Sequence, residues 1–389
     1  GDLFVALKGP VCDGNDHMII AFEKGASFCV VERLPQDFAL HTRCFLVGDS
    51  FDALYALGRF ARARSQAKIV GLTGSFGKTS CKEALRLVLE RQGSTCATKS
   101  SFNNHWGVPL SVAGLSENDA YGVFEMGMNH PGEIGPLAQV VRPHVGLITN
   151  IHGAHIANMG SPEAIAQEKA CLFEGIAPSG FAVIPLESPY YDILAHKADA
   201  QALHIITFGT RESADVHVLS HTITSQGLCI SLKIKGRSIE VNMPVFQAHW
   251  AMNAAAILAC VEALGADVEK AARDLQYFVL PQGRGAHIQV IHPKGGTFTI
   301  VDESYNAGPA SMAAAIQTLG ILEHQAQGRR IVILGDMLEL GEESQREHQA
   351  LAPLLQEAHV DMVFTLGQGM LDLRQVLPEH MLALHAADN

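Results

Sequence analysis

A glycine-rich loop with one lysine and two hydroxyl residues, GLTGSFGKTS at 71–80, is the segment best suited to chemistry. Backbone N–H groups in such a loop turn inward onto phosphate oxygens, and the N-terminus of a following helix adds partial positive charge. Lys78 would then reach the β- and γ-phosphates of a nucleotide, and the hydroxyl of Thr79 would bind Mg²⁺. The spacing is unusual, because the common nucleotide loop places its outer glycine where this chain has Leu72.

Other polar residues follow later strands of the same region. Glu125 ends the strand expected over 121–127, and His152 and His155 follow the strand expected over 144–151. Lys169 lies on the next helix, expected over 162–173, among mostly apolar neighbours. Open α/β sheets bind ligands at the carboxyl ends of their strands, so a carboxylate and an imidazole here are candidate ligands of a nucleotide-bound metal. For either histidine alone, an ordinary hydrogen-bonded side chain is the simpler interpretation.

The elements that must position these residues alternate between strand and helix. A strand rich in Ile, Val and Leu precedes the loop and an amphipathic helix follows it; further strands are YGVFEMG, HVGLITNI, GFAVIPL and HIITFG. This alternation predicts a mostly parallel sheet with helices on both faces. Residues 215–245 instead favour antiparallel strands, followed by a helix over 248–264 and the Pro/Gly-rich linker LPQGRGA.

The two ends of the chain predict smaller α/β units. Short strands separated by Gly/Asp turns occupy about the first 50 residues, and a helix over 51–66 leads to the loop. The final hundred residues predict a strand FTIVDE, a helix over 310–322, a strand RIVILGD, a helix over 343–358 and a last strand, MVFTLG. We expect this last sheet to be incomplete, with further residues after Asn389 in the native protein.

Composition limits the class of protein. At 389 residues with 48% hydrophobic content and 36 Gly, the chain is expected to be a soluble α/β protein of two or three domains. The net charge of −12 argues against a nucleic-acid surface, and no apolar run is long enough to predict a membrane span. The eight Cys show neither a CxxC pair nor zinc spacing, which favours buried, reduced thiols in a cytoplasmic protein.

An ordered set of motifs resembles the Mur ligases of bacterial cell-wall synthesis. The set is GDLFVALKG, TGSFGKTS, FNNHWGVPLS, EMGMNHPGEI, TNIHGAH, HWAMNAAA, DESYNAGPASMAAAI and LGDMLELG. That family's ATP loop has the form found at 73–80, which accounts for the displaced glycine. The resemblance implies an N-terminal UDP-muramoyl-peptide-binding domain (1–64), a central P-loop ATPase domain (65–285) and a C-terminal Rossmann-like, dipeptide-binding domain (286–389), truncated here.

The same resemblance assigns roles to individual positions. The ATP-binding positions are Thr73, Gly74, Ser75, Phe76, Gly77, Lys78, Thr79, Ser80, Asn253, Arg284 and Asp302. The catalytic positions are Lys78, His155, Lys169 and Arg284, and the metal-binding positions are Thr79, Glu125, His155 and Lys169. The substrate-binding positions are Asn103, Asn104, Tyr305, Asn306 and Asp336.

Among these, Asn253 would face the adenine, Asp302 the ribose and Arg284 the γ-phosphate, while Lys169 would be carbamylated. His152 stands where relatives often have a small residue, and we treat it as incidental. Trp250 is unusual within its motif.

The implied activity is ATP- and Mg²⁺-dependent peptide-bond formation in peptidoglycan precursor synthesis. The last two motifs are most similar to members that add D-alanyl-D-alanine to a UDP-N-acetylmuramoyl-tripeptide, whose third residue is lysine or diaminopimelate. We expect a monomer without nucleic-acid partners or membrane insertion. The alternatives are another amino-acid ligase of the Mur/folylpolyglutamate superfamily, or a non-catalytic nucleotide-binding homologue.

Overall fold

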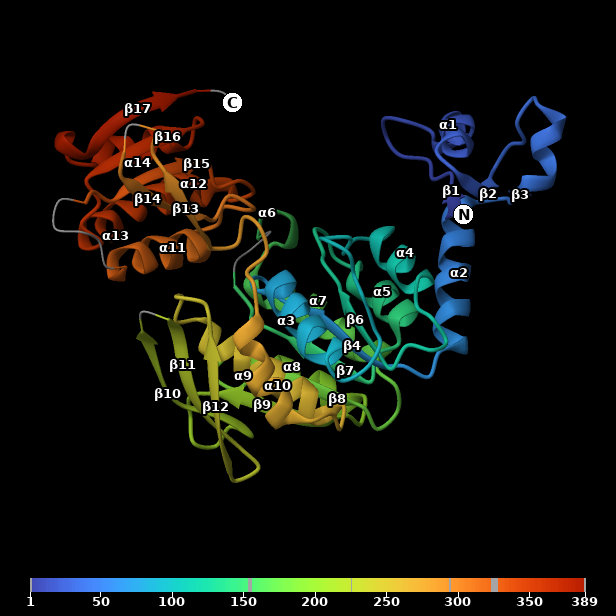
Figure 1. The fold of residues 1–389 in the computed structure, drawn as a ribbon, viewed down its shortest axis with the longest axis horizontal. Coiled ribbons are helices and arrows are strands. Elements are labelled where there is room, and N and C mark those ends of the chain that lie inside the picture. Colours follow the sequence, from blue (N-terminus) through green and yellow to red (C-terminus); the bar gives the residue numbers. More distant parts are fainter. Residues whose placement is uncertain (1, 153–155, 225, 294, 323–327, 388–389) are drawn as a thin grey trace.

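The computed structural model describes residues 2–152, 156–224, 226–293, 295–322 and 328–387. Within these ranges the strands form a three-stranded sheet, a nine-stranded sheet, a two-stranded hairpin and a second three-stranded sheet, in chain order. Figure 1 shows the first and last sheets at opposite ends of the molecule, on either side of the large one. The boundaries expected at 64/65 and 285/286 stay predictions.

The N-terminal sheet is small and parallel. It consists of β1 (Asp2–Val5), β2 (Ala26–Val31) and β3 (Cys44–Leu46), with α1 (Met18–Glu23) packed against it. Helix α2 (Ser50–Arg64) leads from this sheet to the central unit (Figure 1) and packs on α4 and α5. Asp49 caps its first turn, and the carboxylate of Glu32 accepts hydrogen bonds from the backbone and hydroxyl of Ser50, so the junction is fixed at both sides.

The central sheet has the strand order β12-β11-β10-β9-β8-β7-β4-β6-β5. Its strands are β4 (Lys68–Thr73), β5 (Thr95–Ala97), β6 (Tyr121–Glu125), β7 (Val145–Ile148), β8 (Phe181–Pro185), β9 (His204–Gly209), β10 (Val216–Thr224), β11 (Gly227–Ile234) and β12 (Arg237–Met243). The strands from β5 to β10 pair in parallel, and β10, β11 and β12 pair antiparallel, as expected from the sequence.

Helices cover both faces of this sheet. They are α3 (Lys78–Glu90), α4 (Gly107–Ala113), α5 (Ile134–Val141), α6 (Ile156–Met159), α7 (Pro162–Ala170), α8 (Tyr191–Ala200), α9 (Trp250–Ala263) and α10 (Val268–Asp274). Successive residues of a strand point to opposite faces. Thus Val70 of β4 joins the core under α3 and α9, whereas Ile69 joins the core under α5 and α7. The helix expected over 162–173 ends earlier, at Ala170, and continues as a 3₁₀ segment (Cys171–Gly175).

The C-terminal unit begins with an antiparallel hairpin, β13 (Ala286–Ile291) and β14 (Thr297–Asp302). Its parallel sheet has β15 (Ile331–Gly335), β16 (Met362–Leu366) and β17 (Leu382–Ala386), with α11 (Pro309–Ile321), α12 (Ser344–Gln349), α13 (Leu351–Glu357) and α14 (Met370–Val376). Two expectations are corrected here. The helix expected over 343–358 is two short helices, and β17 is a strand beyond the one expected to be last.

Two further findings bear on the class of protein. No helix in the described ranges combines the length and the apolar character needed to cross a membrane. All eight cysteines are free; Cys29, Cys81 and Cys260 are buried, whereas Cys12 is exposed. The expectation of buried thiols is therefore right for these three and wrong for Cys12.

Trp250 and Trp106 offer a test of the core, because they are the two tryptophans of the chain. Trp250 is 1% exposed and its ring centroid lies 4.8 Å from that of Phe278, whereas Trp106 is 44% exposed. We predict that Trp250→Ala lowers the free energy of unfolding by about 3–5 kcal/mol, measured by urea denaturation followed by circular dichroism. The control Trp106→Ala is expected to change it by less than about 1 kcal/mol. Equal losses for the two variants would contradict this picture of the core.

Candidate active site

The glycine-rich loop lies between β4 and α3 and is held by the end of the neighbouring strand β7. The backbone N–H of Ser75 donates to the carbonyl of Asn150, and the backbone N–H of Phe76 donates to the side-chain oxygen of Asn150. The hydroxyl of Thr149 donates to the carbonyl of Phe76 at 2.7 Å. A Cβ at Gly74 would lie 1.9 Å from that hydroxyl oxygen, so the position needs glycine. The first half of the loop is therefore packed against the sheet.

Lys78 begins α3 and folds back over this loop. Its amine donates to the carbonyls of Gly74 at 2.7 Å and Ser75 at 3.2 Å. Desolvation lowers the pKa of Lys78; the charge of Glu125 opposes this effect and that of Arg284 adds to it. Gly77, directly before the helix, has φ of 76°, a left-handed conformation that favours glycine.

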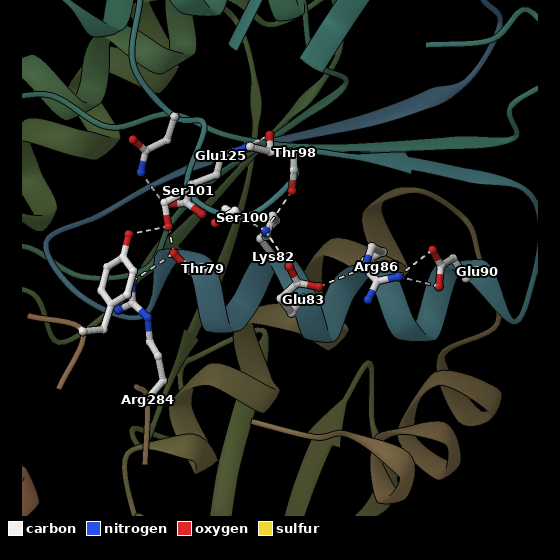
Figure 2. A network of polar contacts seen from close by, with 12 residues as sticks. Thr79, Lys82, Glu83, Arg86, Glu90, Thr98, Ser100, Ser101, Glu125 and Arg284 are labelled. Carbon is white, nitrogen blue, oxygen red and sulfur yellow. Dashed lines mark hydrogen bonds and ion pairs between the residues drawn. The ribbon is translucent and has the colours of Figure 1, made fainter. Parts of the chain in front are cut away.

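Four side chains from separate segments meet beside the loop (Figure 2). Glu125 ends β6, whose register pairs it with Leu72 of β4, and it is completely buried. Its Oε1 accepts from the hydroxyl of Thr79 at 3.1 Å and from the side-chain nitrogen of Asn103 at 2.7 Å. The guanidinium of Arg284 donates to the same Thr79 hydroxyl at 3.2 Å. The structure thus brings together four positions that the sequence had assigned to metal, substrate and phosphate.

The other oxygen of Glu125 suits a metal ion. Oε2 is buried and makes no hydrogen bond with the described residues, which is costly for a carboxylate. Mg²⁺ is typically bound through one or two carboxylates and the phosphates of its nucleotide, so one buried carboxylate beside a threonine hydroxyl fits it. No cluster of three or more His, Cys, Asp or Glu residues suited to a metal occurs in the described part of the chain. The expected ligand His155 lies outside the described residues.

Lys169 is buried on α7, with Ile165 and Ala166 of the same helix also in the core. Desolvation lowers the pKa of Lys169 well below its usual value, and the charge of Lys78 lowers it further. The charge of Glu168 opposes this lowering, and its carboxylate accepts from the backbone N–H groups of Gly132 and Ile134, both at 2.8 Å. Burial at this site therefore disfavours the charged form of the amine.

The expected adenine and ribose positions lie along the loop and the linker. Asn253 of α9 is buried next to Gly77, and its side-chain nitrogen has no partner among the described residues. Asp302, at the end of β14, accepts from the N–H of Gly283 at 3.1 Å and from both the hydroxyl and N–H of Ser304. The hydrogen bonds from Ser304 lower the pKa of Asp302. In this structure Asp302 thus fixes the linker turn that carries Arg284.

The positions expected to bind substrate divide into two groups. Tyr305 belongs to the cluster, since Arg284 lies 3.9 Å from its ring centroid and its hydroxyl bonds that of Ser101. In contrast, Asp336 accepts from the N–H groups of Gly369 and Met370 at the start of α14. Asn104 likewise accepts from Gly107 N–H at the start of α4, and Asn306 is exposed. The contacts of Asp336 and Asn104 are therefore those of helix caps.

Sequence reasoning missed some residues beside this cluster. Ser101, Lys82 and Gln247 were not singled out, because an isolated serine, lysine or glutamine has no spacing that indicates a site. The incidental residue His152 contacts the loop twice: its backbone exchanges hydrogen bonds with the hydroxyl of Ser75, and its ring centroid lies 5.7 Å from that of Phe76.

A cavity of about 390 Å³ opens between the start of α3 and the linker. It is lined by Thr79, Glu83, Ser100, Ser101, Pro281, Gln282, Gly283, Arg284, Ser304 and Tyr305. One wall is therefore the nucleotide-loop helix, and the opposite wall is the segment that joins the central and C-terminal units. A ligand in this cavity would contact both.

Comparison with known proteins defines the class. The Mur ligase middle domain matches residues 72–261, and the Mur ligase glutamate ligase domain matches residues 287–387. The chain belongs to the Mur ligase family. Within it, the chain is 32% identical over 379 residues to the UDP-N-acetylmuramoyl-tripeptide–D-alanyl-D-alanine ligase of Rickettsia prowazekii, covering 97% of this chain and 82% of that protein.

Solved structures agree with this placement. A crystal structure of MurF from Acinetobacter baumannii superposes with a TM-score of 0.87 at 31% identity, over 99% of this chain and 82% of that chain. MurF ligase from Thermotoga maritima in complex with ADP gives a TM-score of 0.80 at 26% identity, over 100% of this chain and 91% of that chain. The three-domain Mur ligase architecture expected from the sequence is confirmed.

The close approach at Gly74 generates a prediction. Gly74→Ala is expected to weaken ADP binding at least about tenfold in isothermal titration, because the added methyl would displace Thr149 and with it the loop. Gly48→Ala is the control, since a Cβ there meets nothing within 4 Å. Unchanged ADP affinity in Gly74→Ala would show that this loop conformation is not required for the nucleotide.

Proposed function

We propose that this chain is an ATP-dependent ligase that adds D-alanyl-D-alanine to UDP-N-acetylmuramoyl-tripeptide in peptidoglycan precursor synthesis. The observation that carries the proposal is the union of a nucleotide loop with Glu125 and Arg284, in a chain similar almost end to end to ligases of that name. We place this reaction in the cytoplasm.

The reaction proceeds in two steps. An oxygen of the tripeptide carboxylate attacks the γ-phosphorus of ATP. The bond between this phosphorus and the β-phosphate oxygen breaks, so that ADP departs and the tripeptide becomes an acyl phosphate. The amine of the dipeptide then attacks the acyl carbon, a tetrahedral intermediate forms, and phosphate departs with the bonding electrons as the amine loses its proton. Lys78 and Arg284 stabilise the charge that moves onto the phosphate oxygens, and the loop positions the nucleotide.

The remaining ATP and metal positions fit around this chemistry. The backbone from Thr73 to Ser80 cradles the phosphates, Asn253 contacts the adenine and Asp302 the ribose. Thr79 and Glu125, with His155 by resemblance, would hold Mg²⁺, which neutralises phosphate charge when bound. The partnerless Oε2 of Glu125 supports this assignment.

The two other substrates would meet in the cavity between α3 and the linker. Asn103 and Ser101 lie on the side of the central unit, and Tyr305 lies on the side of the C-terminal unit. We assign the muramoyl-peptide to the first side and the dipeptide to the second, with residues 1–64 binding the UDP moiety. Asn104 would lie near the muramoyl-peptide, and Asn306 and Asp336 would lie on the dipeptide side.

The direct test measures phosphate release by the purified chain with ATP, Mg²⁺ and UDP-N-acetylmuramoyl-tripeptide. We predict turnover with D-alanyl-D-alanine and little with D-alanine, L-alanine or D-glutamate. Parallel reactions with the lysine- and diaminopimelate-containing tripeptides identify the third residue. Turnover with single amino acids but not the dipeptide would favour another ligase of the superfamily, and no turnover with any acceptor would favour a non-catalytic homologue.

Lys169 is proposed to be carbamylated. Desolvation and the charge of Lys78 lower the pKa of its buried amine, and a neutral amine adds to CO₂ to give a carbamate anion after loss of a proton. This change replaces a cation by oxygen donors beside the metal position, and hard cations prefer oxygen ligands. An unmodified, charged lysine would instead repel the metal.

We predict that Lys169→Ala lowers kcat by about 10²–10³, the usual effect of losing one electrostatic contact in an active site. Added acetate is expected to restore part of the rate, because a free carboxylate supplies the missing oxygens. Lys197→Ala is the control, since Lys197 pairs with Glu174 at the surface. Full activity of Lys169→Ala without acetate, or loss that no short carboxylate restores, would contradict the carbamate.

A further inference from the structure

Lys82 of α3 is a buried cation outside the residues assigned so far. It is 0% exposed, one turn beyond Thr79 on the helix that starts at the loop. Its amine donates to the carbonyls of Thr98 and Ser100, both at 2.8 Å, and lies 2.6 Å from Oε1 of Glu83 (Figure 2). An ammonium group has three N–H donors, so these contacts satisfy it completely. Burial of a charge is tolerated only with such compensation.

The carboxylate of Glu83 is in turn held ionised by its neighbours. Burial alone would raise the pKa of Glu83, but hydrogen bonds from Lys82 and Arg86 lower it overall. Arg86 also donates to Glu90 at 2.8 Å, and the alternating charges run along the surface of α3. Lys82 therefore has a fixed ionic partner on its own helix, while its two other donors reach a different segment.

That segment contains a strained turn. Ser100 has φ of 50°, a left-handed conformation that is unfavourable for a residue with a side chain. Such strain persists only where surrounding contacts impose it. The hydrogen bond from Lys82 to the carbonyl of Ser100 is a contact of this kind, made from the rigid helix α3.

The turn determines where the next residues lie. The side chain of Asn103 donates to Glu125, and the hydroxyl of Ser101 bonds that of Tyr305, which carries Arg284 against its ring. Arg284 donates to Thr79, and Thr79 donates to Glu125. The contacts form a closed circuit beside the cavity, and the segment from Ser100 to Asn103 is the part of it that Lys82 anchors.

We propose that Lys82 is a positioning residue for the ligase reaction, holding the Ser100 turn so that Asn103 orients Glu125 and Ser101 meets Tyr305. The expected effect on kcat/KM rests on the proposed function. Lys82 contacts neither nucleotide nor substrate, and it acts through the segment it holds. Its loss should therefore affect the muramoyl-peptide and the phosphoryl transfer more than the binding of ADP by the loop.

The test variant is Lys82→Met, which keeps the length of the side chain and removes the charge and donors. We expect kcat/KM for the UDP-muramoyl-tripeptide to fall by about 10–100-fold, the scale expected when active-site groups are misplaced by a fraction of an ångström to an ångström. ADP affinity without Mg²⁺ should change less than about twofold, because the loop is held by β7 instead. The matched control, Arg86→Met, removes an exposed cation from the same helix and should leave kcat/KM unchanged.

Two double variants separate positioning from general stability. Lys82→Met with Asn103→Ala should be little worse than Asn103→Ala alone, because both act on Glu125; multiplied losses would overturn the proposal. Lys82→Met with Ser100→Gly should recover part of kcat/KM, because glycine adopts the left-handed turn without strain. If the single variant Lys82→Met does not fold, this second double variant replaces it. A kcat/KM near that of Arg86→Met would then support the proposal, and a kcat/KM far below it would overturn the proposal.

A final measurement is independent of turnover. Mg²⁺ is expected to increase ADP affinity less in Lys82→Met than in the unsubstituted chain, because Glu125 is less well oriented. If the unsubstituted chain releases no phosphate, the proposed function fails, whereas this binding comparison still judges Lys82. An equal gain in ADP affinity on adding Mg²⁺, or unchanged kcat/KM in an active enzyme, would overturn the role of Lys82.

Discussion

The buried carboxylate of Glu125 is the constraint around which the site is built. A carboxylate removed from water needs donors or a cation, and Glu125 receives one hydrogen bond from α3 and one from the segment before α4. Both donors, Thr79 and Asn103, therefore have to be held in place. The register of β4 with β6 sets Glu125 beside the strand that leads to Thr79, and Lys82 holds the turn that precedes Asn103. The second oxygen has no partner among the described residues, and a buried carboxylate oxygen of this kind is suited to a cation.

Local charge around the site differs from that of the whole chain. The protein carries a net charge of −12, yet Lys78 begins the helix that carries Thr79, and Arg284 donates to the Thr79 hydroxyl that bonds Glu125. Desolvation lowers the pKa of Lys78 and that of Lys169. The charge of Arg284 lowers the pKa of Lys78 further, and the charge of Lys78 lowers that of Lys169 further. An acidic protein thus places two basic side chains, Lys78 and Arg284, next to its nucleotide loop, where local charge rather than net charge governs the binding of an anion.

Much of this arrangement follows from sequence, for identifiable reasons. The loop, its strand and its helix have a strong local pattern, and parallel strand ends share one edge, so Lys78, Thr79 and Glu125 could be placed together in advance. Helix ends were less well predicted: α7 stops at Ala170, and the helix expected over 343–358 divides at Ala350. The second break has a signal in the sequence, because Pro353 lacks the N–H and crowds the carbonyl of Gln349 that a continuous helix would use. Lys82 and Ser101 were not predictable, because their roles depend on contacts between segments and on a left-handed turn at a serine.

The bond between Arg284 and Thr79 has a consequence for exchange at the site. The guanidinium already occupies the hydroxyl that a nucleotide-bound metal would use, so nucleotide entry substitutes one partner of Thr79 for another. The free energy of this internal bond is subtracted from nucleotide affinity, and the same amount is returned when the spent nucleotide departs and the guanidinium swings back. The linker would thereby compete with a nucleotide-bound metal for Thr79, so the same contact that weakens binding would favour release of the nucleotide.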